Sequence, residues 1–173
     1  KLSRMTARGE CVQIVKGLYE TDKSVPGYLL AGSIYGPSYI SFEYAMSYYG
    51  LIPEAVYTVT SATFEKKKKK RYETPFGTFT YCDVPAEAFP LELILVQEGD
   101  YFYRIASPEK AVCDKLYTMS PTANIKELYA LLADDLRIDM DALKKLDQSK
   151  LAQLSGKYHS TNVKKLCSLI RRL

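Results

Sequence analysis

The stretch from residue 36 to residue 53 constrains the fold of this chain most, because it reads as a short helix with a marked start. Ser41 is placed to cap that start, since a serine hydroxyl can accept a hydrogen bond from a free N–H of the first turn. Glu43 follows in the first turn, where the helix dipole favours a negative charge. No residue here pairs a nucleophile with a base, so periodicity alone favours a packed core helix.

The end of this helix is marked by Gly50, because glycine readily adopts the left-handed conformation that ends helices. That conformation would bring Leu51 back onto Met46. Pro53 then prevents the helix from resuming.

Three phrases of the sequence, taken together, resemble the AbiEi family, the antitoxins and transcriptional regulators of type IV toxin–antitoxin (abortive infection) operons. The first is PSYIS-x-E-x-A-x-x-Y-x-GLIPE at 37–54, the second IASPEKAVCDKLY at 105–117, and the third, weaker one KGLY at 16–19. Their order and spacing match from about residue 10 to the end of the chain.

The resemblance implies an antitoxin and autoregulator. In that family an N-terminal winged helix binds operator DNA, and the C-terminal domain counters a nucleotidyltransferase toxin without forming a stable complex with it. The positions that match the family phrases are the candidate antitoxin residues: Tyr39, Ser41, Glu43, Tyr48, Gly50, Glu109, Lys110 and Asp114.

Length and composition indicate one globular domain, or one domain and a fragment of another, within 173 residues. No apolar run approaches the roughly 18–20 residues of a membrane span. The four cysteines are scattered and the chain has a single histidine, which argues against a zinc site and a disulfide framework and predicts a cytoplasmic protein without cofactors. The first residue is Lys1 rather than Met, so we expect that the true N-terminus is absent.

The N-terminal segment, residues 1–22, predicts the end of a truncated winged helix. Residues 1–7 read as the tail of a helix with Gly9 as its stop, and 11–15 and 18–19 read as short strands. An ordinary N-terminal arm fits the same pattern, and the resemblance favours the wing. Arg8 and Lys16 would then contact nucleic acid.

A basic run, Lys66–Arg71, lies between two predicted strands, 55–63 and 76–82. Residues 64–73 hold six of the 24 basic and two of the 20 acidic side chains, which leaves 18 of each elsewhere. The run reads either as a solvated hairpin tip or as a phosphate-contacting loop formed by Lys66, Lys67, Lys68, Lys69, Lys70 and Arg71. It lacks interleaved aromatic residues, so any binding should be non-specific and salt-sensitive.

Downstream, 91–96 and 101–105 predict a second hairpin, and Ser107–Pro108 predicts the start of a helix. On that helix Lys110 and Asp114 are four residues apart and would pair for only a few tenths of a kcal/mol if exposed. One interpretation makes these charges part of a helix start at the surface. The other gives them a role in antitoxicity.

The C-terminal part predicts short helices capped by Asp139, Asp147 and Asn162, with their leucines on one face. A short helix around 28–35 precedes the stretch described first. We therefore predict an α+β fold: a wing remnant at 1–22, then an antitoxin domain at 23–173. That domain would hold a small antiparallel or mixed sheet of about four strands at about 23–106 and a helical bundle at about 107–173.

Enzyme signatures are missing from the sequence. It has no phosphate-cradling glycine loop, no G-x-S-x-G elbow and no base beside a nucleophile, so the chain is predicted not to be an enzyme. The alternative to the antitoxin is a protein-interaction or scaffolding module whose aromatic surface binds a partner.

Overall fold

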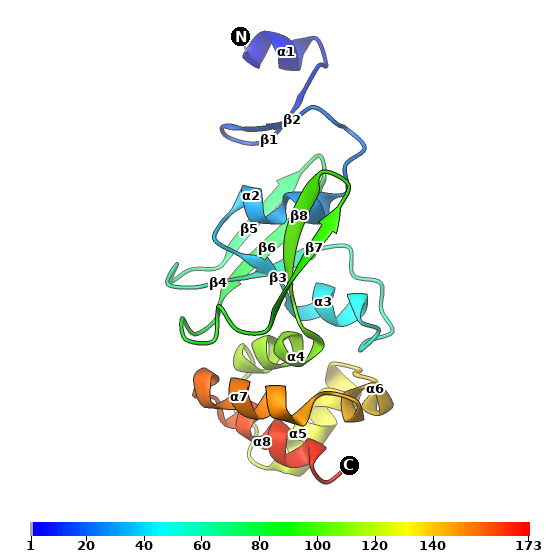
Figure 1. Ribbon diagram of the computed structural model, residues 1–173, viewed down its shortest axis with the longest axis vertical. Helices are drawn as coiled ribbons and strands as arrows, with labels where there is room; N and C mark the ends of the chain where they lie inside the picture. The colour runs from blue at the N-terminus through cyan, green and yellow to red at the C-terminus, as the bar shows by residue number, and fades with distance from the viewer. Residues whose placement is uncertain (1) are drawn as a thin grey trace.

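The computed structural model describes residues 2–173, which form an α+β structure with eight α-helices and mixed β-structure. Lys1, the first residue of the predicted N-terminal helix, lies outside that range. Figure 1 shows three levels along the long axis: a small N-terminal segment, a sheet with short helices, and the C-terminal helices.

The N-terminal segment contains helix α1 (Leu2–Ala7) and the antiparallel pair β1 (Val12–Val15) and β2 (Leu18–Glu20), as predicted. Gly9 ends α1 in the left-handed conformation, with a φ of 72°. The Tyr101 hydroxyl donates to the Glu20 carboxylate at 3.2 Å and so connects this hairpin to the main sheet.

The main sheet has six strands in the order β5-β6-β4-β3-β8-β7, where about four were predicted. The pairs β4–β6 and β3–β8 are parallel and the other three are antiparallel. The strands are β3 (Tyr39–Ile40), β4 (Val59–Thr63), β5 (Lys70–Thr74), β6 (Gly77–Asp83), β7 (Leu93–Glu98) and β8 (Tyr101–Ala106).

The predicted hairpin of 55–63 with 76–82 is wrong. Strand β4 begins only at Val59, and β6 runs parallel to it. The hairpin partner of β6 is β5, which the basic composition of its sequence concealed. Strand β5 lies at the edge of the sheet, and its residues alternate between half-buried and exposed. Apolar and polar residues do not alternate along it, because an edge strand tolerates charged side chains.

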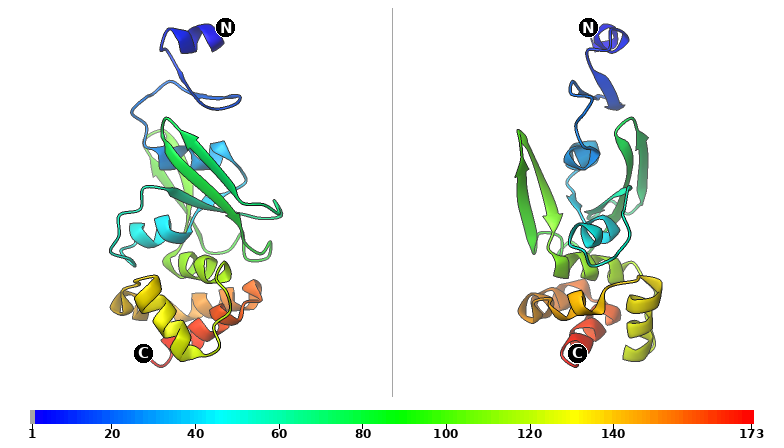
Figure 2. Two further views of the ribbon diagram at one scale, coloured as in Figure 1. Left: turned by 180° about the vertical axis from the view of Figure 1, so that it is seen from behind. Right: turned by 90° about the vertical axis from the view of Figure 1, so that its right-hand side faces the viewer.

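The sheet opens into two arms with a helical segment between them, as the right-hand view of Figure 2 shows. That segment is the 3-10 helix η1 (Gly27–Leu30) followed by α2 (Ala31–Ile34), close to the predicted helix at 28–35. It contacts both arms. The Tyr81 hydroxyl of β6 donates to the Ala31 carbonyl at 2.7 Å, and Tyr28 packs edge-on against Tyr103 of β8 at 5.5 Å.

Helix α3 (Phe42–Tyr48) follows the central strand β3 and ends as predicted. Gly50 has a φ of 68°, and the Leu51 N–H donates to the Met46 carbonyl at 2.8 Å. The predicted cap is wrong: Ser41 occupies the N-cap position, but its side chain accepts no bond from the first turn. Thr60 of β4 replaces it, because its hydroxyl accepts from the Tyr44 N–H at 3.0 Å.

The C-terminal helices are α4 (Pro108–Tyr117), α5 (Ile125–Ala130), the π-helical turn η2 (Leu131–Asp135), α6 (Met140–Lys144), α7 (Gln148–Tyr158) and α8 (Thr161–Ile170). Asp139 and Asp147 cap α6 and α7 as predicted. Asn162 is not a cap. It lies buried within α8, where its side chain accepts from the Thr122 N–H and donates to the Ser120 carbonyl.

The stability of the α3 end can be tested with two glycine substitutions. A Cβ at Gly50 would meet nothing within 4 Å, so the cost of Gly50→Ala comes from the left-handed backbone alone. We expect a loss of about 1 kcal/mol in the free energy of unfolding.

Gly156, inside α7, is the matched control because a Cβ there also meets nothing within 4 Å and the position is helical. Gly156→Ala should stabilise the protein by roughly 0.5–1 kcal/mol. Urea unfolding of both variants measures the difference, and two changes of the same sign would contradict this account.

Candidate functional site

Helix α4 holds the second family phrase, and it lies between the sheet and the last helices (Figure 1). It contacts α3 and β8 on one side and α7 and α8 on the other. Its start is the predicted one, since the Ser107 hydroxyl accepts from the Lys110 N–H and Pro108 stands at the first position. Because neighbours cover this helix from both sides, its polar residues Glu109, Lys110 and Asp114 are buried.

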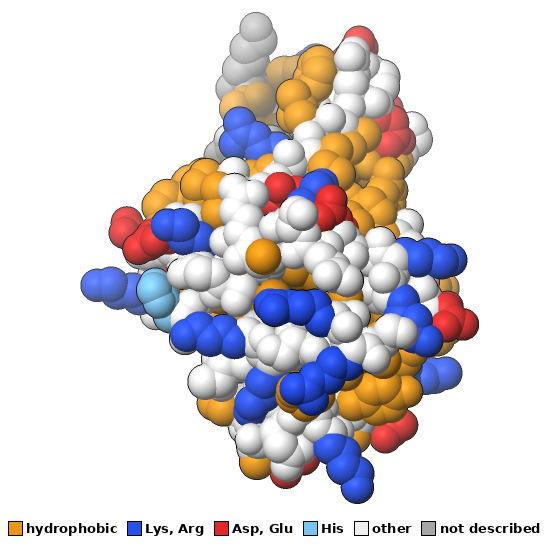
Figure 3. Space-filling model, turned by 60° about the horizontal axis from the view of Figure 1, so that its bottom comes forward, with side chains coloured by type: hydrophobic (Ala, Val, Ile, Leu, Met, Phe, Trp, Pro, Cys, Tyr) orange, Lys and Arg blue, Asp and Glu red, His pale blue; other side chains and the backbone are white. Residues whose placement is uncertain are grey.

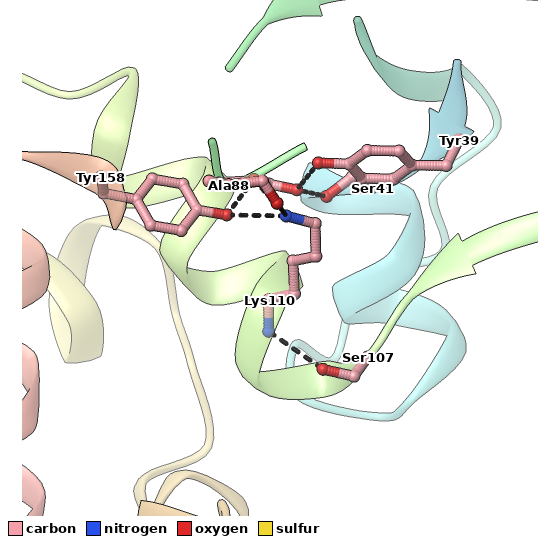
Figure 4. Close-up of polar contacts among 7 residues, drawn as sticks. Tyr39, Ser41, Ala88, Ser107, Lys110 and Tyr158 are labelled. Atoms are coloured by element: carbon pink, nitrogen blue, oxygen red, sulfur yellow. Dashed lines mark hydrogen bonds and ion pairs between the residues drawn. The ribbon is translucent and has the colours of Figure 1, made fainter. Parts of the chain in front are cut away.

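The Asp114 carboxylate is the centre of a buried hydrogen-bond network. Figure 4 shows its partners Tyr39, Ser41, Lys110 and Tyr158 converging from different elements. Its Oδ2 accepts from the Ser41 hydroxyl at 2.6 Å and from the Tyr39 hydroxyl at 3.0 Å. Its Oδ1 accepts from the Tyr158 hydroxyl of α7. The network therefore joins the first family phrase to the second and adds a residue from near the C-terminus.

Lys110 completes the network from one turn earlier on α4. Its Nζ donates to the Ala88 carbonyl at 2.6 Å and to the Tyr158 hydroxyl at 3.1 Å, and lies 3.8 Å from Oδ1 of Asp114. It also lies over the rings of Tyr39 and Tyr158, at 5.1 and 5.4 Å from their centroids. Both charged side chains are fully buried.

Burial and pairing act on these groups in opposite directions. Burial raises the pKa of Asp114, while Lys110 and the three hydroxyls oppose that rise. Burial lowers the pKa of Lys110, and Asp114 opposes that change. Burial and the neighbouring carboxylate raise the pKa values of Tyr39 and Tyr158, so both phenols stay protonated and can donate. Every group facing the carboxylate is a donor, which is the arrangement an ionised Asp114 requires.

The interpretation of Lys110 and Asp114 as weakly paired surface charges is therefore wrong. The two residues are four positions apart, as in ion pairs on the surface of a helix, but α7 and β3 cover the face of α4 on which they lie. Glu109 is also buried, and its Oε1 accepts from the Asp147 N–H at 3.0 Å, which attaches α4 to the start of α7.

The remaining antitoxin candidates lie outside this network. Glu43 forms an ion pair with Lys115 of α4 at the surface of the α3–α4 contact. Tyr48 is 56% exposed, and Gly50 has the helix-ending role described above. Of the antitoxin candidates, four therefore belong to the buried network: Tyr39, Ser41, Lys110 and Asp114.

The residues of the predicted basic loop, 66–71, lie in two different parts of the structure. Lys66 donates to the Gly36 carbonyl at 3.1 Å and lies over the Tyr35 ring, whereas Lys70 and Arg71 belong to strand β5. Lys67, Lys68 and Lys69 are exposed in the connection before β5. The run is therefore a crossing between strands followed by an edge strand, not a hairpin tip.

Arg8 and Lys16, the other predicted nucleic-acid contacts, are exposed in the N-terminal segment, and Arg8 lies 3.7 Å from Glu10. They are not part of the β5 region.

The sequence interpretation treated the basic residues of the last helix, Lys164, Lys165, Arg171 and Arg172, as separate solvated charges and not as part of a larger basic region. Residues 148–173 contain six Lys or Arg side chains and no Asp or Glu. Figure 3 shows the face formed by the C-terminal helices, where Lys and Arg side chains are prominent. Outside residues 64–73 the chain has equal numbers of basic and acidic side chains, but they are not evenly distributed. A separate count of charges over the last two helices would have revealed the basic excess there.

Within residues 2–173 no group of three or more His, Cys, Asp or Glu side chains is placed to hold a metal ion. In the same range no helix has both the length and the apolar character needed to cross a membrane. Among known proteins, no family model matches the chain and no curated protein matches it significantly.

The coupling of the buried pair can be measured with a double-mutant cycle. Lys110→Met or Asp114→Asn alone should cost about 3–5 kcal/mol in the free energy of unfolding, since each leaves the other side chain buried without its partner. The double variant should cost less than their sum by about 1–3 kcal/mol.

If a single variant fails to fold, Tyr158→Phe tests the same network without removing either charge. It should cost at least about 1.5–3 kcal/mol, since the lost hydroxyl donates to Asp114 and accepts from Lys110. Tyr117→Phe is its control, because Tyr117, the last residue of α4, is 40% exposed and its substitution should change stability little. Strictly additive costs in the cycle, or equal costs for the two tyrosine variants, would contradict the coupling.

Proposed function

We propose that this chain is an AbiEi-like antitoxin domain of a type IV toxin–antitoxin system, acting in the cytoplasm as a regulator and not as an enzyme. The observation that carries the proposal is the convergence on Asp114. Ser41 and Tyr39 come from one family phrase and Lys110 and Asp114 from another, and they meet in one buried network. A shared network explains why such phrases would occur together in one domain.

The N-terminal segment supports the regulatory half of the proposal. Helix α1 followed by the β1–β2 hairpin has the order of elements with which a winged helix ends. In the full-length protein the complete winged helix would bind operator DNA. The basic face of the C-terminal helices, shown in Figure 3, would add contacts to phosphates without reading bases.

An interaction module is the second candidate, and an exposed apolar pair favours it. Leu95 is 64% and Phe102 60% exposed, and the register of β7 with β8 puts them on the same face of this hairpin. Exposed apolar pairs of this kind are typical of protein contacts.

Growth rescue separates the two candidates. The chain is expressed together with the nucleotidyltransferase toxin of an AbiE operon, alongside the variant Leu95→Ser/Phe102→Ser. The antitoxin proposal predicts that both proteins restore growth and that the toxin does not co-purify with either.

Absence of rescue by the folded wild-type chain, at an expression level confirmed by immunoblotting, would contradict the proposal. Rescue that is lost in the double variant, together with a stable complex for the wild type, would favour the interaction module.

A further inference from the structure

A pocket of about 310 Å³ lies where β5, β6 and β4 meet the helices α3 and α4. The cations Lys69, Arg71 and Lys115 are among its lining residues. Lys70 lines it as well, but it stands opposite Tyr81 in the β5–β6 register, so its side chain lies on the other face of the sheet from Arg71. Glu43 is the only carboxylate among its lining residues, so Lys69, Arg71, Lys115 and Glu43 together give this face of the sheet a net charge of +2 at the pocket. Cavities of this size are typical of sites for small molecules.

The ion pairs of the pocket leave much of this charge available. Lys115 is paired with Glu43, and Arg71 lies 3.1 Å from Glu73. Within residues 2–173, neither Lys69 nor Lys70 has an ion pair. Lys69 directly precedes the edge strand β5, whereas Lys115 comes from α4, so the positive charge reaches the pocket from two parts of the fold.

The remaining wall combines hydroxyl groups with apolar surface. Thr80 and Thr118 line the pocket beside Phe42 and Cys82. Phe42 has a φ of 54°, a left-handed conformation that a bulky residue rarely adopts. Such backbone outliers occur preferentially at ligand sites, and here the outlier is in the pocket wall.

From this arrangement we infer that the pocket binds a small organic oligophosphate, such as a nucleoside triphosphate, with its phosphate groups against Lys69 and Arg71. The concave shape of the pocket favours a small ligand. The phosphate backbone of a duplex would instead fit a flat or convex basic surface, such as the face of the C-terminal helices in Figure 3. Several cations converging on one pocket match several adjacent negative charges. The apolar part of the wall matches the organic part of the ligand.

Calorimetric titration of the full chain tests this at constant ionic strength, with inorganic phosphate, pyrophosphate, tripolyphosphate and ATP as probes. We expect saturable binding that strengthens with each added phosphate group. Lys69→Ser/Arg71→Ser should weaken tripolyphosphate binding at least tenfold, since it removes two cations at the pocket. Lys164→Ser/Arg172→Ser, which removes two exposed cations from the C-terminal helices, should change it less than twofold.

The outcomes separate the possible sources of the phosphate groups. Tighter binding of ATP than of tripolyphosphate assigns the site to a nucleotide, and equal binding restricts it to the oligophosphate group. The inference is overturned if tripolyphosphate does not bind saturably, if both double variants weaken binding equally, or if a short duplex binds at Lys69 and Arg71 more tightly than tripolyphosphate. The titration requires no toxin, so its result is independent of the growth rescue.

Discussion

The buried pair of Lys110 and Asp114 is the interaction on which the rest of this structure depends. Moving two charges out of water costs several kcal/mol each, and only pairing with additional hydrogen bonds offsets that cost. Here the bonds come from β3, from the residue before α3, from the loop at Ala88 and from α7. The sheet and the C-terminal helices must therefore both be in place before the pair is satisfied.

This requirement explains why the polar residues Tyr39, Ser41, Lys110 and Asp114 lie inside the molecule. A purely apolar contact between α3, α4 and α7 would tolerate small shifts of one helix along another. A carboxylate with three donors at fixed positions does not, so the network sets how the helices sit on the sheet. The C-terminal helices and the sheet are consequently held in one fixed arrangement.

Sequence patterns predicted the local features of this fold well and the long-range ones poorly. Glycine at 50, proline at 108 and aspartates at 139 and 147 mark helix ends through short-range chemistry, and each acts as expected. Ser41 and Asn162 look like caps by the same criteria, yet their side chains bond to residues more than 35 positions away. The parallel pairing of β4 with β6 and the burial of Lys110 also depend on distant neighbours, which no local pattern contains.

Native-state hydrogen exchange tests most directly whether the buried pair joins the two parts into one cooperative unit. The account predicts that the slowest amides of β6 and those of α7 exchange with the same opening free energy, within about 1 kcal/mol, because they open only in global unfolding. Exchange of α7 and α8 at a clearly lower free energy, with β6 still protected, would show that the helices open separately. The buried pair would then not be what holds the molecule together.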